Sequence, residues 1–109
     1  MDVPETPAAT RQGFDDLVEE LAGRGVTAAK MFGVPSLKAR GKVIGCLWGD
    51  ALVFKLPPEG VEAALKLTGA EAFDPMGGRP MREWIVVPSA HAAGWRAFGD
   101  QALDYLSGG

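Results

Sequence analysis

Short turns between apolar runs are the sequence feature that most limits how this chain can fold. Residues 43–48 and 51–56 are both rich in strand-forming side chains, and only Gly49 and Asp50 separate them. A second short turn joins the first run to an extended stretch over residues 36–39. Parallel strands need a crossover of a dozen or more residues. The sequence therefore predicts that these three segments form an antiparallel meander.

Apolar residues at helical spacing predict a helix near each end of the chain. In the first helix, Thr6 is the expected N-cap and Pro7 the first helical residue. Its apolar stripe is formed by Phe14, Leu17, Val18 and Leu21. In the last helix, Ser89 is the expected N-cap. Its stripe is formed by Trp95, Phe98, Ala102 and Leu106.

Other patterns between the terminal helices predict two further strands, one ambiguous segment and one short helix. Strands are expected over residues 29–32 and 83–87, whereas residues 70–74 are ambiguous between coil and a brief strand. After the proline pair at 57–58, a short helix is expected to share one face among Val61, Ala64, Leu65 and Thr68. The predicted fold is α+β, a single antiparallel sheet of about four to five strands with helices on one face.

Length and composition indicate one soluble folded domain over residues 1–109, with residues 1–5 expected to be mobile. Apolar residues make up 47% of the chain and charged residues 23%, which is typical of a globular protein. The longest apolar runs fall far short of the ~20 residues that cross a bilayer. We see no basic, apolar leader at the N-terminus, so we expect a cytoplasmic protein without membrane association.

Nucleophilic and metal chemistry have little support in the sequence. Cys46 and His91 are the single cysteine and the single histidine, so an internal disulfide and a cysteine-based zinc cluster are excluded. Cys46 lies in a predicted strand between apolar neighbours, which favours a buried, unreactive thiol. We expect His91 on the surface near the start of the last helix. The sequence thus predicts no catalytic residue, no metal site and no cofactor.

A glycine-rich loop over residues 76–82 carries two arginines, Arg79 and Arg82. Backbone N–H groups and arginine side chains together can hold a phosphate. The loop lacks the GxxxxGK[ST] pattern, however, and a strand follows it where a phosphate site would have a helix N-terminus. The other interpretation is a wide turn whose arginines are solvated or paired with acids.

Cations cluster in the middle of a chain whose net charge is −3. Residues 31–48 contain three basic side chains and no acidic one. The candidate contacts for nucleic acid or another anion are Lys30, Lys38, Arg40, Lys42, Arg79 and Arg82. So few cations support only weak, salt-sensitive binding of nucleic acid. The alternative is solubilising charge on a hairpin edge.

The strands carry apolar residues on both of their faces. Strict alternation places Trp84 opposite Ile85 and Val87. In the same way it places Ile44, Cys46 and Trp48 opposite Val43 and Leu47. A second subunit, an apolar ligand or the domain's own loops would each cover such a second face. Trp48 and Trp84 are therefore candidate residues of an interface or a pocket.

Ordered short motifs across most of the chain resemble the N-terminal domain of the TfoX/Sxy competence-regulator family, and the related YjbR/MmcQ-like proteins. They comprise Lys30-Met31-Phe32-Gly33, Gly41-Lys42, Leu47-Trp48-Gly49-Asp50 with the strand after it, Gly69-Ala70-Glu71-Ala72-Phe73, Gly78-Arg79-Pro80-Met81 and Trp84-Ile85-Val86-Val87-Pro88.

The resemblance implies a compact α+β domain with an antiparallel sheet and no enzymatic activity. In the long competence regulators a second, helical domain follows; this sequence ends at Gly109 without a counterpart, so a role in competence is not carried over. We expect a small non-enzymatic binding or regulatory domain whose partner is a second copy or another protein. The alternatives are a weak nucleic-acid-binding module and a small-ligand-binding domain.

Overall fold

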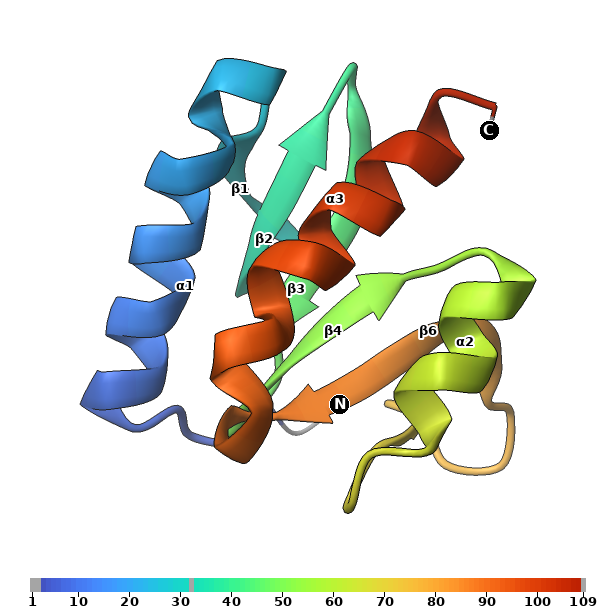
Figure 1. The fold of residues 1–109 in the computed structure, drawn as a ribbon. Helices are drawn as coiled ribbons and strands as arrows, with labels where there is room; N and C mark the ends of the chain where they lie inside the picture. Colours follow the sequence, from blue (N-terminus) through green and yellow to red (C-terminus); the bar gives the residue numbers. More distant parts are fainter. Residues whose placement is uncertain (1–2, 32, 109) are drawn as a thin grey trace.

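One six-stranded antiparallel sheet in the order β1-β2-β3-β4-β6-β5 organises the fold (Figure 1). The computed structural model describes residues 3–31 and 33–108. The strands are β1 (Thr27–Met31), β2 (Val34–Ala39), β3 (Lys42–Leu47), β4 (Ala51–Lys55), β5 (Glu71–Phe73) and β6 (Met81–Pro88). The helices are α1 (Ala8–Leu21), α2 (Pro58–Leu65) and α3 (Trp95–Leu106), with 3-10 segments η1 (Ala22–Arg24) and η2 (Ser89–Gly94).

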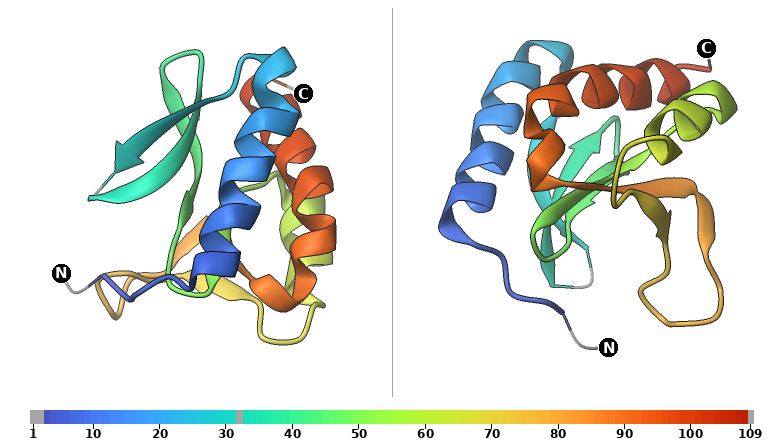
Figure 2. Two further views of the ribbon diagram at one scale, coloured as in Figure 1. Left: turned by 90° about the vertical axis from the view of Figure 1, so that its left-hand side faces the viewer. Right: turned by 60° about the horizontal axis from the view of Figure 1, so that its bottom comes forward.

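All three α-helices lie on one face of the sheet, as the sequence predicts (Figures 1 and 2). Phe14 and Leu21 of α1 are buried, as are Trp95 and Phe98 at the start of α3. They pack against sheet residues that include Leu52, Phe54, Ile85 and Val87. The predicted α+β class with terminal helices and a short helix between them is confirmed. The sheet has six strands in place of four to five, because residues 27–31 and 71–73 both pair into it.

The opposite face of the sheet carries a second apolar cluster, which we call the open face. Its floor is formed by the buried residues Val34, Cys46, Val53 and Phe73. Its rim is formed by the half-buried residues Met31, Trp48, Met81, Trp84 and Val86. The prediction that the strands are apolar on both faces is confirmed, and Trp84 does lie opposite Ile85 and Val87.

A β-bulge overturns the predicted alternation along β3. The pairing of β2 with β3 shifts between Leu37 and Lys38, which leaves Ile44 as the extra residue. Ile44 is 2% exposed and packs in the helix-covered core beside Leu47, not with Cys46 on the open face. The prediction from strict alternation was wrong here, because one extra residue in a strand moves every side chain beyond it to the opposite face from the one that alternation predicts.

The starts of both terminal helices differ from the prediction. The N-cap of α1 is Pro7, in place of Thr6, and no side-chain cap is present there. At the C-terminal end a six-residue 3-10 segment, η2, begins at Ser89 and delays α3 until Trp95. Ser89 is therefore not its N-cap. Its backbone N–H donates instead to the Asp50 carbonyl at 3.0 Å, which ties η2 to the β3–β4 turn.

Other predicted boundaries are close to those observed. The first strand covers residues 27–31 where 29–32 was expected, and Phe32 lies outside the described residues. On α2 the predicted inner face holds for Ala64 but is wrong for Leu65, which is 46% exposed. Residues 1–2 of the N-terminal stretch expected to be mobile also lie outside the described residues. No helix among those described is both long and apolar enough to span a bilayer.

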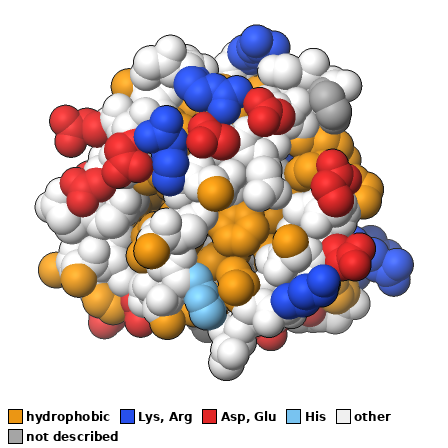
Figure 3. Space-filling view, in the orientation of Figure 1, with side chains coloured by type: hydrophobic (Ala, Val, Ile, Leu, Met, Phe, Trp, Pro, Cys, Tyr) orange, Lys and Arg blue, Asp and Glu red, His pale blue; other side chains and the backbone are white. Residues whose placement is uncertain are grey.

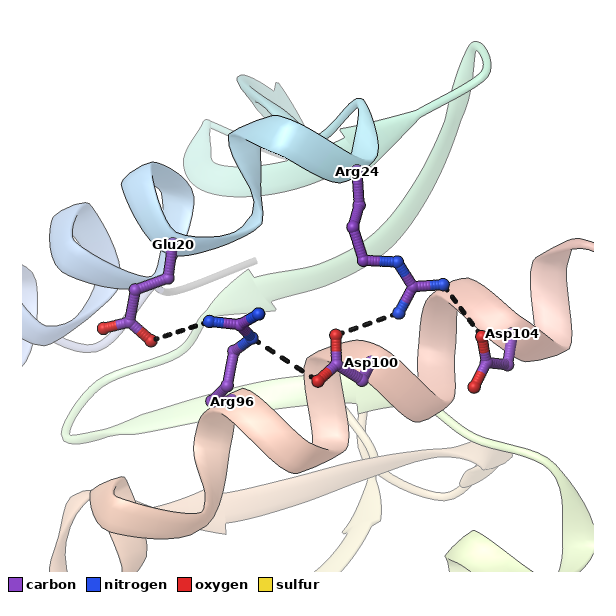
Figure 4. A network of polar contacts seen from close by, with 5 residues as sticks. All are labelled: Glu20, Arg24, Arg96, Asp100 and Asp104. Atoms are coloured by element: carbon purple, nitrogen blue, oxygen red, sulfur yellow. Dashed lines mark hydrogen bonds and ion pairs between the residues drawn. The ribbon is translucent and has the colours of Figure 1, made fainter.

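An ion-pair network on the surface joins α1 and η1 to α3 (Figure 4). Arg24 donates to Asp100 at 2.9 Å and to Asp104 at 2.8 Å. Arg96 lies 3.4 Å from Asp100 and 3.8 Å from Glu20. Because these two arginines already face carboxylates of their own chain, they are poor candidates for binding an external anion.

Candidate binding surfaces

The open face holds both tryptophans that the sequence proposes for an interface or pocket. Trp48 meets Phe73 edge to face, with ring centroids 5.1 Å apart. Trp84 lies on β6 at the register of Lys55. Both rings are half-buried, so they cover the floor of the cluster while keeping part of their surface in solvent. The domain's own side chains therefore cover this face in part.

Cys46 and His91 lie on opposite sides of the sheet. Cys46 is fully buried in the floor of the open face, and burial raises the pKa of its thiol to about 12. His91 lies in η2 on the helix side, where its Nε2 and the Thr68 carbonyl oxygen are 2.9 Å apart. The expected buried thiol is confirmed. A nucleophile and base working as a pair need hydrogen-bond contact, which this arrangement does not provide.

The glycine-rich loop already holds an anionic group from its own chain. The Asp74 carboxylate accepts hydrogen bonds from the backbone N–H of Gly78 at 2.9 Å and of Arg79 at 3.2 Å. A bound phosphate would have to displace this carboxylate from the same donors. Of the two interpretations, the geometry favours a wide turn closed by an aspartate.

The six candidate cations lie in three separate places. Lys38, Arg40 and Lys42 surround the β2–β3 turn. Arg79 and Arg82 lie in and after the loop that leads into β6, and the ribbon views show this loop far from the β2–β3 turn (Figures 1 and 2). Lys30 pairs with Pro35, toward the other end of β1 and β2. The six residues therefore do not form one patch.

A cavity of about 190 Å³ lies between the C-terminal half of α3 and the sheet. One side is lined by Lys42, Val43 and Ile44 of β3, and by Lys55, the last residue of β4. The α3 side is formed by Ala102, Tyr105 and Leu106. Of the charged and phenolic groups in this set, sequence reasoning identified only Lys42 as a candidate site residue. No local motif marks Lys55 or Tyr105, because the three come together only through the fold.

A larger apolar groove of about 540 Å³ separates α2 from η2 and α3. Figure 3 shows hydrophobic side chains gathered in this hollow on the helix side, with the histidine at its lower margin. Small residues form most of its walls, among them Ala63, Ala93 and Ala97, and Phe98 is part of the lining. The groove exists because α2 packs mainly on β6 and leaves a gap beside α3.

Comparisons with known proteins provide no assignment for these surfaces. No family model, no curated protein and no solved structure matches the chain. Within the described part of the chain, no three His, Cys, Asp or Glu side chains gather closely enough to hold a metal ion.

Proposed function

We propose that this chain is a small binding domain without catalytic chemistry of its own, which pairs with a second copy through the open face of its sheet. The observation that carries the proposal is the set of large apolar side chains, Trp48 and Trp84 among them, on a face that none of the described helices covers. An antiparallel sheet that meets only water on one face alternates apolar residues with polar ones. Here the central outward positions, those of Cys46, Val53 and Val86, are apolar too.

The size of the molecule is compatible with such an interface. A standard protein–protein contact buries about 800 Å² on each partner. The whole chain exposes 6049 Å², so that contact would take about an eighth of its surface. Tryptophan and methionine are enriched in interfaces, and both are present on the rim of the open face. Lys38 and Arg40 at the nearby β2–β3 turn would form part of a polar rim.

The fold also supports assigning the chain to the TfoX N-terminal domain family as part of this proposal. An antiparallel α+β domain is what that resemblance implies, and the motif residues Gly41 and Gly49 adopt positive φ angles in tight turns. Glycine is the residue that accepts such angles without strain. Structural roles of this kind are in keeping with a family that acts by binding.

Sedimentation velocity over a wide range of protein concentration tests the dimer. We expect the wild-type chain to pass from monomer to dimer, and the Trp84→Thr variant to remain a monomer. Leu65→Thr is the matched control, because it removes an apolar side chain that is 46% exposed on α2, away from the open face. Circular dichroism checks that both variants fold. A wild-type chain that stays monomeric at the highest concentration would contradict the proposal.

A nucleic-acid-binding module is the second candidate, and the three cations around the β2–β3 turn, Lys38, Arg40 and Lys42, favour it. Three cations give only a small local excess of positive charge. The logarithm of the affinity for an oligonucleotide should then fall linearly with the logarithm of the salt concentration, with a shallow slope. No binding at low salt would exclude this candidate.

A further inference from the structure

We propose that a cavity at the β5 edge of the open face binds an organic cation of the quaternary ammonium class. The cavity has a volume of about 470 Å³, within the range of about 300–1,000 Å³ that is typical of small-molecule sites. Its lining combines the aromatic residues Trp48 and Phe73 with the acidic residues Glu71 and Asp74. One copy of the chain supplies every lining residue, so the proposal goes beyond the dimer and does not depend on it.

The pairing of β5 with β6 places the Glu71 side chain on the open face. Glu71 is the register partner of Val86, a residue of the open-face cluster. Along β5, Ala72 packs against the helix-covered core, whereas Phe73 is buried in the floor of the open face. Because side chains alternate along a strand, the residues on either side of Ala72 point the same way. The exposed Glu71 side chain therefore lies beside Val86 at the edge of this face.

Trp48 supplies the aromatic surface that a cation would contact. Its ring meets Phe73 edge to face, with centroids 5.1 Å apart and planes at 75°. Phe73 is 1% exposed and forms the floor, whereas the half-buried Trp48 keeps part of its surface in solvent. The face of an aromatic ring carries partial negative charge, and indole attracts a cation more strongly than a phenyl ring does.

The charge around the cavity is negative. Within the described part of the chain, no ion pair involves Glu71 or Asp74. The Asp74 carboxylate accepts from the backbone N–H groups of Gly78 and Arg79, which hold it in place without a cationic partner. The Arg79 side chain is exposed, and neither arginine nor lysine is part of the lining. A cavity lined by charge of one sign concentrates ions of the other sign.

The apolar part of the lining determines the class of cation. Among the described residues, no three His, Cys, Asp or Glu side chains gather closely enough to hold a metal ion. A primary ammonium has three N–H donors, each of which needs an acceptor. A quaternary ammonium has no N–H group. Its methyl groups would bury against Trp48, Val86 and Pro80, while its charge stays close to Glu71.

Protein-observed NMR titration with choline chloride tests the site, at a protein concentration where sedimentation shows only monomer. We expect saturable shifts at the indole N–H of Trp48 and at the amides of Glu71 and Val86. Neohexyl alcohol, in which carbon replaces the charged nitrogen of choline, should bind roughly tenfold more weakly. Ammonium chloride, which has the charge without the methyl groups, should also bind roughly tenfold more weakly.

Two variants and a matched control separate this site from general attraction of cations. Glu71→Gln keeps the shape of an exposed side chain and removes its charge, so it should raise the dissociation constant for choline roughly tenfold. Trp48→Leu should raise that constant as much, with circular dichroism as the check on folding. Glu62→Gln is the control, because it removes an exposed carboxylate on α2, on the other face of the sheet, and it should leave the constant unchanged.

Failure of the dimer and failure of this site are distinguishable. A chain that stays monomeric at every concentration would remove the dimer and leave the choline titration unaffected. The cation site is overturned if choline produces no saturable shifts at the cavity, if neohexyl alcohol or ammonium binds equally well, or if Glu71→Gln binds choline as the wild type does.

Discussion

Gly45 lies where β3 passes against its neighbours with no room for a side chain. A Cβ atom there would be 2.6 Å from the carbonyl oxygen of Val53 and 3.3 Å from Cδ1 of Leu37. The backbone of a central strand cannot move aside, so we expect Gly45→Ala to lower the free energy of unfolding by about 1–3 kcal/mol. Denaturant unfolding measures this loss.

Gly23 provides the matched control for that substitution. A Cβ atom at Gly23 would meet nothing within 4 Å, and this glycine is not among those with positive φ. Gly23→Ala should therefore leave stability unchanged or raise it by up to about 1 kcal/mol. Equal losses in the two variants would show that crowding at β4 is not the cause.

Cys46 makes stability depend on pH in the alkaline range. In the unfolded chain its thiol ionises near the ordinary pKa of 9.0, whereas burial holds the native pKa at about 12. Between these values the native state binds more protons than the unfolded state, so stability falls as pH rises. Below pH 9 the thiol is protonated in both states, so its full contribution to the free energy of unfolding is present.

Chemical denaturation from pH 8 to pH 11 measures this effect for the wild type and for Cys46→Ala. The difference between their free energies of unfolding should shrink as pH rises. Tyr105 adds a second pH dependence in the alkaline range, because its hydrogen bond to Glu83 raises its pKa. Both proteins contain Tyr105, so its effect cancels in the difference between them. A difference that stays constant with pH would contradict the burial of the thiol.

At the scale of elements, the bulge in β3 decides which side chain enters the helix-covered core. Ile44 is buried there, while its neighbour Val43 is only half-buried. Ile44→Ala should cost about 2–5 kcal/mol of unfolding free energy, whereas Val43→Ala should cost less than about 1.5 kcal/mol. Thermal and denaturant unfolding of both variants check this order. Strict alternation would predict the opposite order, because it places Val43 with Leu47.

Which elements the sequence predicts depends on whether their signals are local. The turn at Gly49 and the alternating strand after it are visible because turn chemistry and side-chain period coincide over a few residues. The bulge has no such signal, since it is a property of how β3 pairs with β2. In the same way, Ser89 resembles an N-cap locally, and η2 intervenes because the segment is tied to the Asp50 carbonyl.

At the scale of the whole molecule, the candidate site shows the same limit more strongly. Lys42 belongs to a visibly cationic segment, so composition alone identifies it. Lys55 and Tyr105 lie 13 and 63 residues further along the chain, and only the packing of α3 across the sheet brings them to one cavity. A cavity lined by three elements that are distant in sequence needs the topology before it can be recognised.

The order of the strands predicts which parts of the molecule open first. β1 and β4 are both five residues long, but β4 has strand neighbours on both sides and β1 pairs only with β2. Side chains of β4 are almost all buried, whereas those of β1 are mostly exposed. Local opening is easiest where little apolar surface is buried, so amides of β1 that bond to β2 should exchange with solvent well before those of β4.

Native-state hydrogen exchange of the monomer at low concentration measures that order. α2 should exchange early as well, because it packs mainly on β6 and faces the apolar groove on its α3 side. If the open face pairs with a second copy, raising the concentration should slow exchange in β1 and β2 more than in α2, which lies on the other face of the sheet. Slowing confined to α2 would instead place the contact between copies at the groove, and the open face would lose its assigned role.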